Sequence, residues 1–216
     1  MENKKAYSHV IWDWNGTLFN DVGWCVKVIN KMLSARGIKT LKSVSEYYNA
    51  FCFPIINYYK NVGFDFSKEP FEKLAIEYIS LYHSGKSGNC KLYKNTGLVL
   101  EALKENGVIQ VVLSASETGN LLSQMGEFDI NYYFDEILGL SDIYAKSKID
   151  IGLDYMRRKN VARALLIGDT EHDLEVANAL GVDCVLISSG HQSREKLLAC
   201  NVPVAEDITQ ILEYFL

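Results

Sequence analysis

Short and almost continuously apolar runs recur along this chain, and they constrain its fold more than any other feature. The runs cover residues 9–12, 108–113, 134–138, 164–167 and 184–187. Runs of this length are typical of strands that are buried on both faces of a parallel sheet. Segments with helical spacing separate the later runs, and this alternation predicts an α/β fold with a doubly wound parallel sheet. The residues expected inside that sheet are Val10, Ile11, Val111, Val112, Leu165 and Leu166.

Residues 21 to about 90 follow a different pattern. Their apolar side chains repeat with helical period and without a strand-like run, as in Val22, Val26, Ile29 and Leu33. Helix breakers divide the interval into several helices, and these are Gly37, Pro54, Gly63 and Pro70. We therefore expect an α/β core domain of residues 1–19 and 91–216, interrupted by an all-helical cap domain of residues 20–90.

Composition and charge argue against several classes of protein. A chain of 216 residues with 48% hydrophobic content can bury a core of this kind. The formal net charge of -5, with no Lys/Arg run longer than residues 157–159, argues against a nucleic-acid partner. The first apolar run is too short for a secretory signal or a membrane span, so we expect a cytoplasmic protein. Five cysteines without a C-x-x-C pair indicate neither a disulfide framework nor a zinc site.

Four polar clusters follow the predicted strands or lie close to their ends. Ligands bind beyond the carboxyl ends of the strands in an open parallel sheet, so these clusters are the first candidates for chemistry. They comprise Asp13, Asn15 and Thr17 in D-W-N-G-T, Ser114 and Ala115 in S-A-S, Lys146 and Lys148, and Asp169 and Asp173 in G-D-T-E-H-D. Asp13 ends an apolar run between two tryptophans, where an unpaired carboxylate is costly, and this favours pairing or metal binding.

In order and in strand context, these clusters resemble the four motifs of the haloacid dehalogenase superfamily. The resemblance covers the whole chain, because a helical cap between the first and second motifs is similar to that of phosphoglycolate-phosphatase-like members. It implies a magnesium-dependent phosphatase that acts on a small phosphorylated metabolite through an aspartyl-phosphate. The resemblance suggests phosphoglycolate as the substrate only by analogy with other members of the family. The sequence does not indicate the oligomeric state.

The same resemblance implies a nucleophile and a metal site. Asp13 is the expected nucleophile, and a carboxylate attacks phosphorus well only where the phosphoryl charge is offset. Asp13, the backbone carbonyl of Asn15 and Asp169 are the expected Mg²⁺ ligands, with Asp173 in or next to the same shell. Oxygen ligands of this kind suit a hard cation, and converging carboxylates without one would repel each other.

The remaining candidates are expected to bind the phosphoryl group. Ser114, at a strand-to-helix turn, would hydrogen-bond a phosphoryl oxygen together with free amides of the helix start. Thr17 and Ala115 are the further expected phosphate contacts. Lys148, rather than Lys146, is the expected cation beside the nucleophile, because it directly precedes a helical apolar pattern.

Several of these residues also have purely structural interpretations. Residues 170–173 and 114–117 both match the capping-box pattern, so they could simply begin helices. Capping and phosphate binding use the same unpaired amides, so one does not exclude the other. His172 and His191 are expected to be surface or hydrogen-bonded polar residues. The cap tyrosines expected to pack helices include Tyr47, Tyr48, Tyr58 and Tyr59.

Asn15 departs from the pattern of the superfamily. Most phosphatases of this type carry an aspartate there, which protonates the leaving oxygen and then activates water. An amide cannot do this, so acid–base help of about 10²–10⁴-fold would be missing. Three hypotheses follow: slow turnover or a preference for acidic leaving groups such as aryl or acyl phosphates; a phosphonate-cleaving reaction with a Schiff-base lysine such as Lys60 or Lys73; or deamidation of Asn15.

Two other classes of function stay open at this point. A dehalogenase would share the fold and the aspartate nucleophile but needs no metal, and this leaves Asp169 and Asp173 poorly explained. A weakly active module that binds a phosphorylated metabolite would explain Asn15, although Asp13 and Lys148 are retained.

Overall fold

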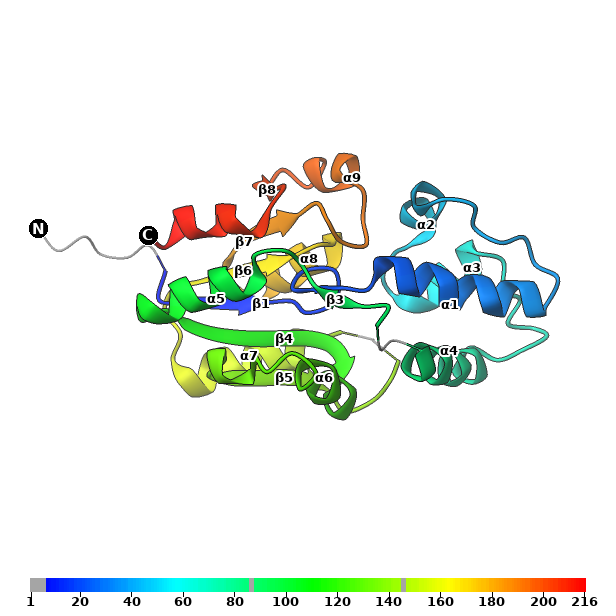
Figure 1. Ribbon diagram of the computed structural model, residues 1–216, viewed down its shortest axis with the longest axis horizontal. Helices are drawn as coiled ribbons and strands as arrows, with labels where there is room; N and C mark the ends of the chain where they lie inside the picture. The colour runs from blue at the N-terminus through cyan, green and yellow to red at the C-terminus, as the bar shows by residue number, and fades with distance from the viewer. Residues whose placement is uncertain (1–6, 86–87, 145–146) are drawn as a thin grey trace, which may run out of the picture.

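A six-stranded parallel sheet forms the centre of the molecule. The computed structural model describes residues 7–85, 88–144 and 147–216 (Figure 1). The strands run in the order β5-β4-β1-β6-β7-β8. Their bounds are β1 (His9–Trp12), β4 (Ile109–Glu117), β5 (Glu136–Leu140), β6 (Ala164–Gly168), β7 (Asp183–Ile187) and β8 (Val204–Ala205). The predicted parallel sheet is therefore confirmed. The fifth strand begins two residues later than its apolar run, and the two-residue edge strand β8 had no sequence signal.

The first strand is central because it pairs with two others. His9 to Trp12 pair with residues 109–112 of β4 on one side and with residues 164–167 of β6 on the other. All six side chains predicted to lie inside the sheet are at most 1% exposed. The carboxyl ends of β1, β4 and β6 consequently meet at one edge.

Helices cover both faces of the sheet. Side chains of α5 (Thr96–Glu105), α6 (Thr118–Met125) and the 3₁₀ helix η2 (Ile208–Tyr214) pack against the face that contains Val10 and Trp12. Side chains of α7 (Ile149–Lys159), α8 (Glu171–Leu180) and α9 (Arg194–Leu198) pack against the face that contains Ile11. Successive strand residues point to opposite faces, which explains this division of the core. The short 3₁₀ helix η1 (Asn131–Tyr133) precedes β5.

Four helices lie in the described part of the segment between Asn20 and Lys91. They are α1 (Val22–Ala35), α2 (Val44–Ala50), α3 (Ile55–Asn61) and α4 (Phe71–Gly85). Each predicted helix breaker lies outside these helices, so the helical character of this interval is confirmed. Figure 1 shows the four helices grouped beyond one end of the sheet, the end toward which β4 runs.

Two short strands connect the four helices to the sheet. β2 (Phe19–Asn20) and β3 (Lys91–Leu92) pair antiparallel, and they bring the entry and exit of the helical segment together. The sequence did not predict them, since two residues carry too little periodicity. The division into residues 1–19 with 91–216 and residues 20–90 stays a prediction, although this pair lies at both of its boundaries. Among the described helices, none has the length and apolar character needed to cross a bilayer.

Candidate functional site

The backbone of Asp13 is fixed at the junction of two strands. Its amide donates a 2.8 Å hydrogen bond to the carbonyl of Ile167 in β6, so Asp13 lies beside the end of that strand. The chain then turns sharply, with Gly16 in the left-handed region at φ 80°. A Cβ at Gly16 would overlap the Asp169 carboxylate, so glycine permits this close approach. The Thr17 hydroxyl lies 3.4 Å from Asp13 Oδ2 and 3.3 Å from Asp169 Oδ1.

The expected carboxylates come together although most of the chain separates them. One oxygen each of Asp13, Asp169 and Asp173 lies within 4.8 Å of the others, and all three residues are buried. The Lys148 ammonium lies 2.5 Å from Asp13 Oδ1 and 2.7 Å from Asp173 Oδ1. Lys148 directly precedes α7, and its side chain is 2% exposed. Lys146, the alternative cation, lies outside the described residues.

Burial governs the electrostatics of this cluster. It raises the pKa of Asp13 to about 6, although the nearby Lys148 ammonium opposes this shift. Burial, with repulsion from the other two carboxylates, raises the pKa of Asp169 well above its ordinary value. For Asp173 burial again favours the protonated form, but the Lys148 charge together with hydrogen bonds from Lys148 and Thr170 outweighs it, and the pKa is lowered. For Lys148 the two carboxylates outweigh burial, so its pKa is raised and the side chain is charged.

The donor set fits a hard divalent cation. Three carboxylates face one ammonium group, which leaves the cluster negative. Asp169 receives neutral donors, the Thr17 hydroxyl and the His191 backbone amide at 2.6 Å, so its charge lacks the lysine contact that the other two carboxylates have. Carboxylate oxygens are the ligands that Mg²⁺ prefers, and a cation between Asp13 and Asp169 would offset the excess charge.

Asp173 has a second, structural task. Its Oδ2 accepts hydrogen bonds from the Asp169 amide (3.1 Å), the Thr170 amide (3.0 Å) and the Thr170 hydroxyl (2.8 Å). The capping pattern at residues 170–173 is therefore confirmed at the start of α8. Because Asp173 Oδ1 binds Lys148, this carboxylate both caps α8 and positions the cation.

The surroundings of Ser114 differ from the prediction. Strand β4 continues to Glu117 past a register shift, so Ser114 lies inside the strand and not at a strand-to-helix turn. Its hydroxyl accepts a hydrogen bond from the Ser116 amide (3.1 Å). Glu117 is the N-cap of α6, and its carboxylate binds the amides of Gly119 and Asn120, so the expected free helix amides are occupied. The proposed capping box of residues 114–117 is wrong for the same reason. Ser114 and Ala115 nevertheless line the cavity beside Asp13.

Asn15 is held by a network that the sequence did not reveal. Its amide nitrogen donates to Asp21 Oδ2 (2.9 Å) and to the Tyr82 hydroxyl (3.3 Å), and its amide oxygen accepts from Ser116 Oγ (2.9 Å). Tyr82 also donates to Asp21 Oδ2 at 2.7 Å. The side chain of Asn15 therefore joins the loop after β1, the second strand-end cluster and helix α4.

His191 is buried and hydrogen-bonded, which is one of the two alternatives expected for this histidine, and its backbone amide also binds Asp169. It is 5% exposed, its Nε2 lies 3.2 Å from Asp21 Oδ1, and its Nδ1 lies 2.7 Å from the Tyr47 hydroxyl. Burial alone would lower the pKa of His191, but the Asp21 carboxylate raises it to about 9. His191 follows Gly190 after the strand β7, so the rule that sites lie at strand ends could have found it. His172 is also buried, and its ring stacks on Phe53.

A cavity of about 180 Å³ lies between the sheet edge and the helical segment. Its floor contains Asp13, Asn15, Ser114, Lys148 and Asp169. Aromatic side chains of the helical segment form much of its wall: Tyr47, Phe51, Phe53, Tyr58, Tyr59, Phe71, Tyr78 and Tyr82. Three of the four tyrosines expected to pack helices are buried against one another and pack as predicted, but Tyr47, Tyr58 and Tyr59 also line this cavity. This cavity, called the chamber below, therefore has a charged floor and a largely aromatic wall.

Comparison with known proteins places this chain in a family. Residues 10–187 match the haloacid dehalogenase-like hydrolases, and this match covers most of the chain. The chain belongs to that family and is a hydrolase of its type. A phosphoglycolate phosphatase of Haemophilus influenzae (strain 86-028NP) is 27% identical over 145 residues. That alignment spans 65% of this chain and 65% of the relative, less than two thirds of its length.

Solved structures agree on the fold. A haloacid dehalogenase-like hydrolase from Streptococcus pneumoniae superposes with a TM-score of 0.83 at 18% identity, over 97% of this chain and 98% of the other. A protein described as a predicted phosphatase from Clostridium acetobutylicum gives a TM-score of 0.78 at 23% identity, over 96% and 97% of the two chains. At these identities the likeness establishes the fold alone.

Proposed function

We propose that this protein is a magnesium-dependent phosphomonoester hydrolase that forms an aspartyl-phosphate on Asp13. The observation that carries the proposal is the meeting of Asp13 and Asp169 beside Lys148, at the floor of a partly enclosed chamber. A metal-free dehalogenase has no use for three converging buried carboxylates, so this cluster favours the phosphatase. The phosphoglycolate phosphatase relative supports the same class of reaction.

The residues of this chain divide the work as follows. An oxygen of Asp13 attacks phosphorus, the bond from phosphorus to the ester oxygen breaks, and water later releases phosphate and restores the carboxylate. Lys148 holds Asp13 in position and offsets phosphoryl charge, while Asp173 holds Lys148. Ser114, Ala115 and Thr17 are the proposed phosphoryl contacts. A Mg²⁺ ion bound by Asp13, the Asn15 carbonyl and Asp169 would supply charge stabilisation and alignment.

We further propose that the leaving group is a phenol-like alcohol. Asn15 cannot protonate a leaving oxygen, so the reaction favours an alcohol that departs as a stable anion. The chamber supports the same substrate class, because aromatic side chains of the helical segment face the leaving group and would pack against a ring. Two buried cations of the described lining, Lys148 and His191, already contact carboxylates, so neither is unpaired for the carboxylate of a substrate such as phosphoglycolate.

Neither lysine suggested for a phosphonate-cleaving reaction reaches this chamber. Lys60 is exposed, and its ammonium lies 5.8 Å from the centre of the Phe66 ring. Lys73 is also exposed and pairs with Glu69 at 2.8 Å. Schiff-base chemistry at either residue is therefore not supported.

A substrate panel with matched alcohols tests the proposal. Phenyl phosphate, an alkyl phosphate of similar size, phosphoglycolate and a haloacid are assayed with and without Mg²⁺, beside the Asp13→Asn variant. We expect Mg²⁺-dependent phosphate release that is at least about tenfold faster for phenyl than for alkyl phosphate and is lost in the variant. Halide release without metal, or release that survives in Asp13→Asn, would contradict the hydrolase mechanism. Fastest release from phosphoglycolate would contradict the leaving-group proposal alone.

A further inference from the structure

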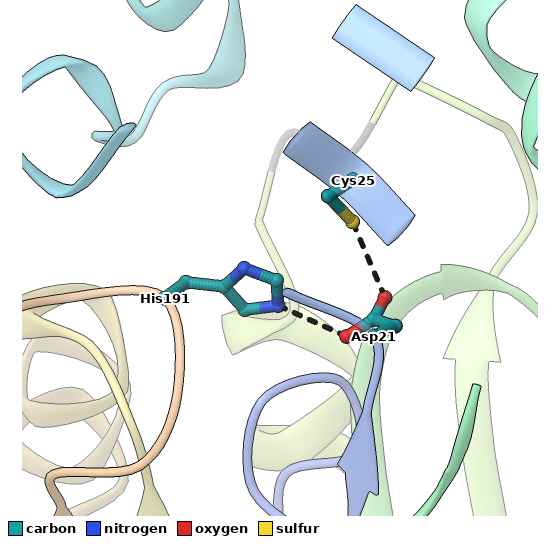
Figure 2. Close-up of side chains that lie close together, drawn as sticks. All are labelled: Asp21, Cys25 and His191. Atoms are coloured by element: carbon teal, nitrogen blue, oxygen red, sulfur yellow. Dashed lines mark hydrogen bonds and ion pairs between the residues drawn. The ribbon is translucent and has the colours of Figure 1, made fainter. Parts of the chain in front are cut away.

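A second group of metal-ligating side chains lies beside the catalytic carboxylates. Figure 2 shows the side chains of Cys25 and His191 both directed at the carboxylate of Asp21. Asp21 is the N-cap of α1, Cys25 lies one turn into that helix, and His191 belongs to the loop after β7. The group therefore joins the helical segment to the sheet.

The distances within this group are close to those between the ligands of one ion, although the two shortest contacts involve different oxygens of Asp21. Cys25 Sγ lies 3.4 Å from Asp21 Oδ2, and His191 Nε2 lies 3.2 Å from Asp21 Oδ1. One ligand atom of each residue lies within 4.8 Å of the other two. A tetrahedral ion with bonds of about 2.0 to 2.3 Å separates its ligands by roughly 3.3 to 3.8 Å. A small adjustment of these side chains is enough to hold such an ion.

The hydrogen bonds around the group leave ligand atoms for an ion. Asp21 is 2% exposed, and among the described residues its Oδ1 has no aligned hydrogen-bond donor, although His191 Nε2 lies 3.2 Å away as an ion-pair partner. All the donors to this carboxylate reach Oδ2 instead, from Asn15, Tyr82 and Cys25. A buried carboxylate oxygen without an aligned donor is costly, and a cation bound to this oxygen would satisfy it.

The imidazole of His191 is oriented as metal ligands usually are. Its Nδ1 is held by the Tyr47 hydroxyl at 2.7 Å, which leaves Nε2 directed at Asp21. A ligating histidine almost always has its other ring nitrogen fixed in this way. All three residues line the chamber, so a fourth coordination position is available to water or substrate.

We propose that Asp21, Cys25 and His191 bind one transition-metal ion of the zinc or cobalt(II) class, at a site separate from the three catalytic carboxylates. The donor set decides the class, because one sulfur, one imidazole nitrogen and one oxygen suit these ions, whereas Mg²⁺ prefers oxygen ligands. An ion here would tie α1 to the loop after β7, and thereby stiffen one wall of the chamber. Without an ion, His191 and Asp21 form a buried ion pair.

Cobalt(II) is the probe for this site. The full chain is stripped with a chelator, saturated with Mg²⁺ and titrated with Co²⁺ while thiolate-to-cobalt charge-transfer absorption is recorded. We expect one equivalent of Co²⁺ to produce this band, and one equivalent of Zn²⁺ to abolish it. Cys25→Ser should remove the band, and Asp21→Asn should weaken binding by at least about tenfold. The matched control is Cys184→Ser, a buried cysteine in strand β7, which should leave the band unchanged.

The outcomes separate this site from the proposed hydrolase reaction. Asp13→Asn should keep the cobalt band, since Asp13 is not one of the three ligands. A wild-type chain that gives no band, or a Cys25→Ser variant that keeps it, would overturn the site whatever the phosphatase assay finds. If Cys25→Ser does not fold by circular dichroism, His191→Gln replaces it. A cobalt band of unchanged strength in that variant would also overturn the proposal.

Discussion

Exchanging the side chains at positions 15 and 21 would test why this protein carries an amide in place of the usual acid. The Asn15 amide nitrogen lies 2.9 Å from the Asp21 carboxylate. In Asn15→Asp alone, two carboxylates would face each other at this distance. With an effective dielectric constant of about 20, their repulsion amounts to about 6 kcal/mol as an upper bound. This corresponds to roughly four pKa units, so the new carboxyl group would stay protonated at neutral pH or destabilise the fold.

The double variant Asn15→Asp with Asp21→Asn conserves both the net charge and the hydrogen bond between the two positions. A carboxyl group would then stand where the acid of related enzymes acts, without a like charge beside it. We expect turnover of an alkyl phosphate to rise by about 10²–10⁴-fold over wild type, because the leaving oxygen now receives a proton. Turnover of an aryl phosphate should change far less, since its leaving group departs without one.

Steady-state rates with both phosphates, together with thermal unfolding, distinguish the variants. The Asn15→Asp variant should lose stability and gain little alkyl turnover, because the proton of its carboxyl group would be held in a hydrogen bond to Asp21. The Asp21→Asn variant should gain none. If the double variant hydrolyses the alkyl phosphate no faster than either single variant, the electrostatic explanation of Asn15 is wrong.

Other predictions concern the buried charges. Lys148→Met leaves Asp13 and Asp173 unpaired and should lower the free energy of unfolding by about 3–5 kcal/mol in chemical denaturation, together with loss of phosphate release; an unchanged denaturation midpoint would contradict this. Mg²⁺ at about 100 times its Kd should stabilise the wild type by about 2.7 kcal/mol, which raises Tm by several degrees, and an equal rise in Asp169→Asn would exclude that ligand. In metal-free buffer, the pKa of His191 is about 9 in the folded protein and 6.5 in the unfolded chain, so protonation of His191 stabilises the fold fully below pH 6.5. Chemical denaturation should show that the free energy of unfolding falls by up to about 3 kcal/mol as the pH rises to 9. The His191→Gln variant should lose most of this pH dependence.

The sheet could be predicted because its strands are buried on both faces. Near-continuous apolar runs give such strands a strong signal, and Val10, Ile11 and Leu165 lie where that signal placed them. The strands β2, β3 and β8 have two residues each, so neither periodicity nor composition marks them. Their positions follow from tertiary contacts that a local pattern does not contain.

The residues of the candidate site could likewise be predicted only in part. Asp13, Lys148 and Asp169 could be anticipated because each follows a recognisable strand or precedes a recognisable helix. The pairing of Asp21 with His191 could not, because 170 positions separate the two and each residue alone has an ordinary structural interpretation. The surroundings of Ser114 were mistaken since the strand continues past a register shift, which apolar periodicity does not record.

The hydrogen bond from the Asp13 amide to Ile167 has a consequence for how such enzymes diversify. It anchors Asp13, the proposed nucleophile, to the strand that leads to Asp169, so the proposed reaction would depend on one rigid part of the sheet. The aromatic wall that would select the alcohol belongs to a separate stretch of chain. Mutations in this aromatic wall could therefore change which alcohol is selected without changing the residues that carry out the reaction.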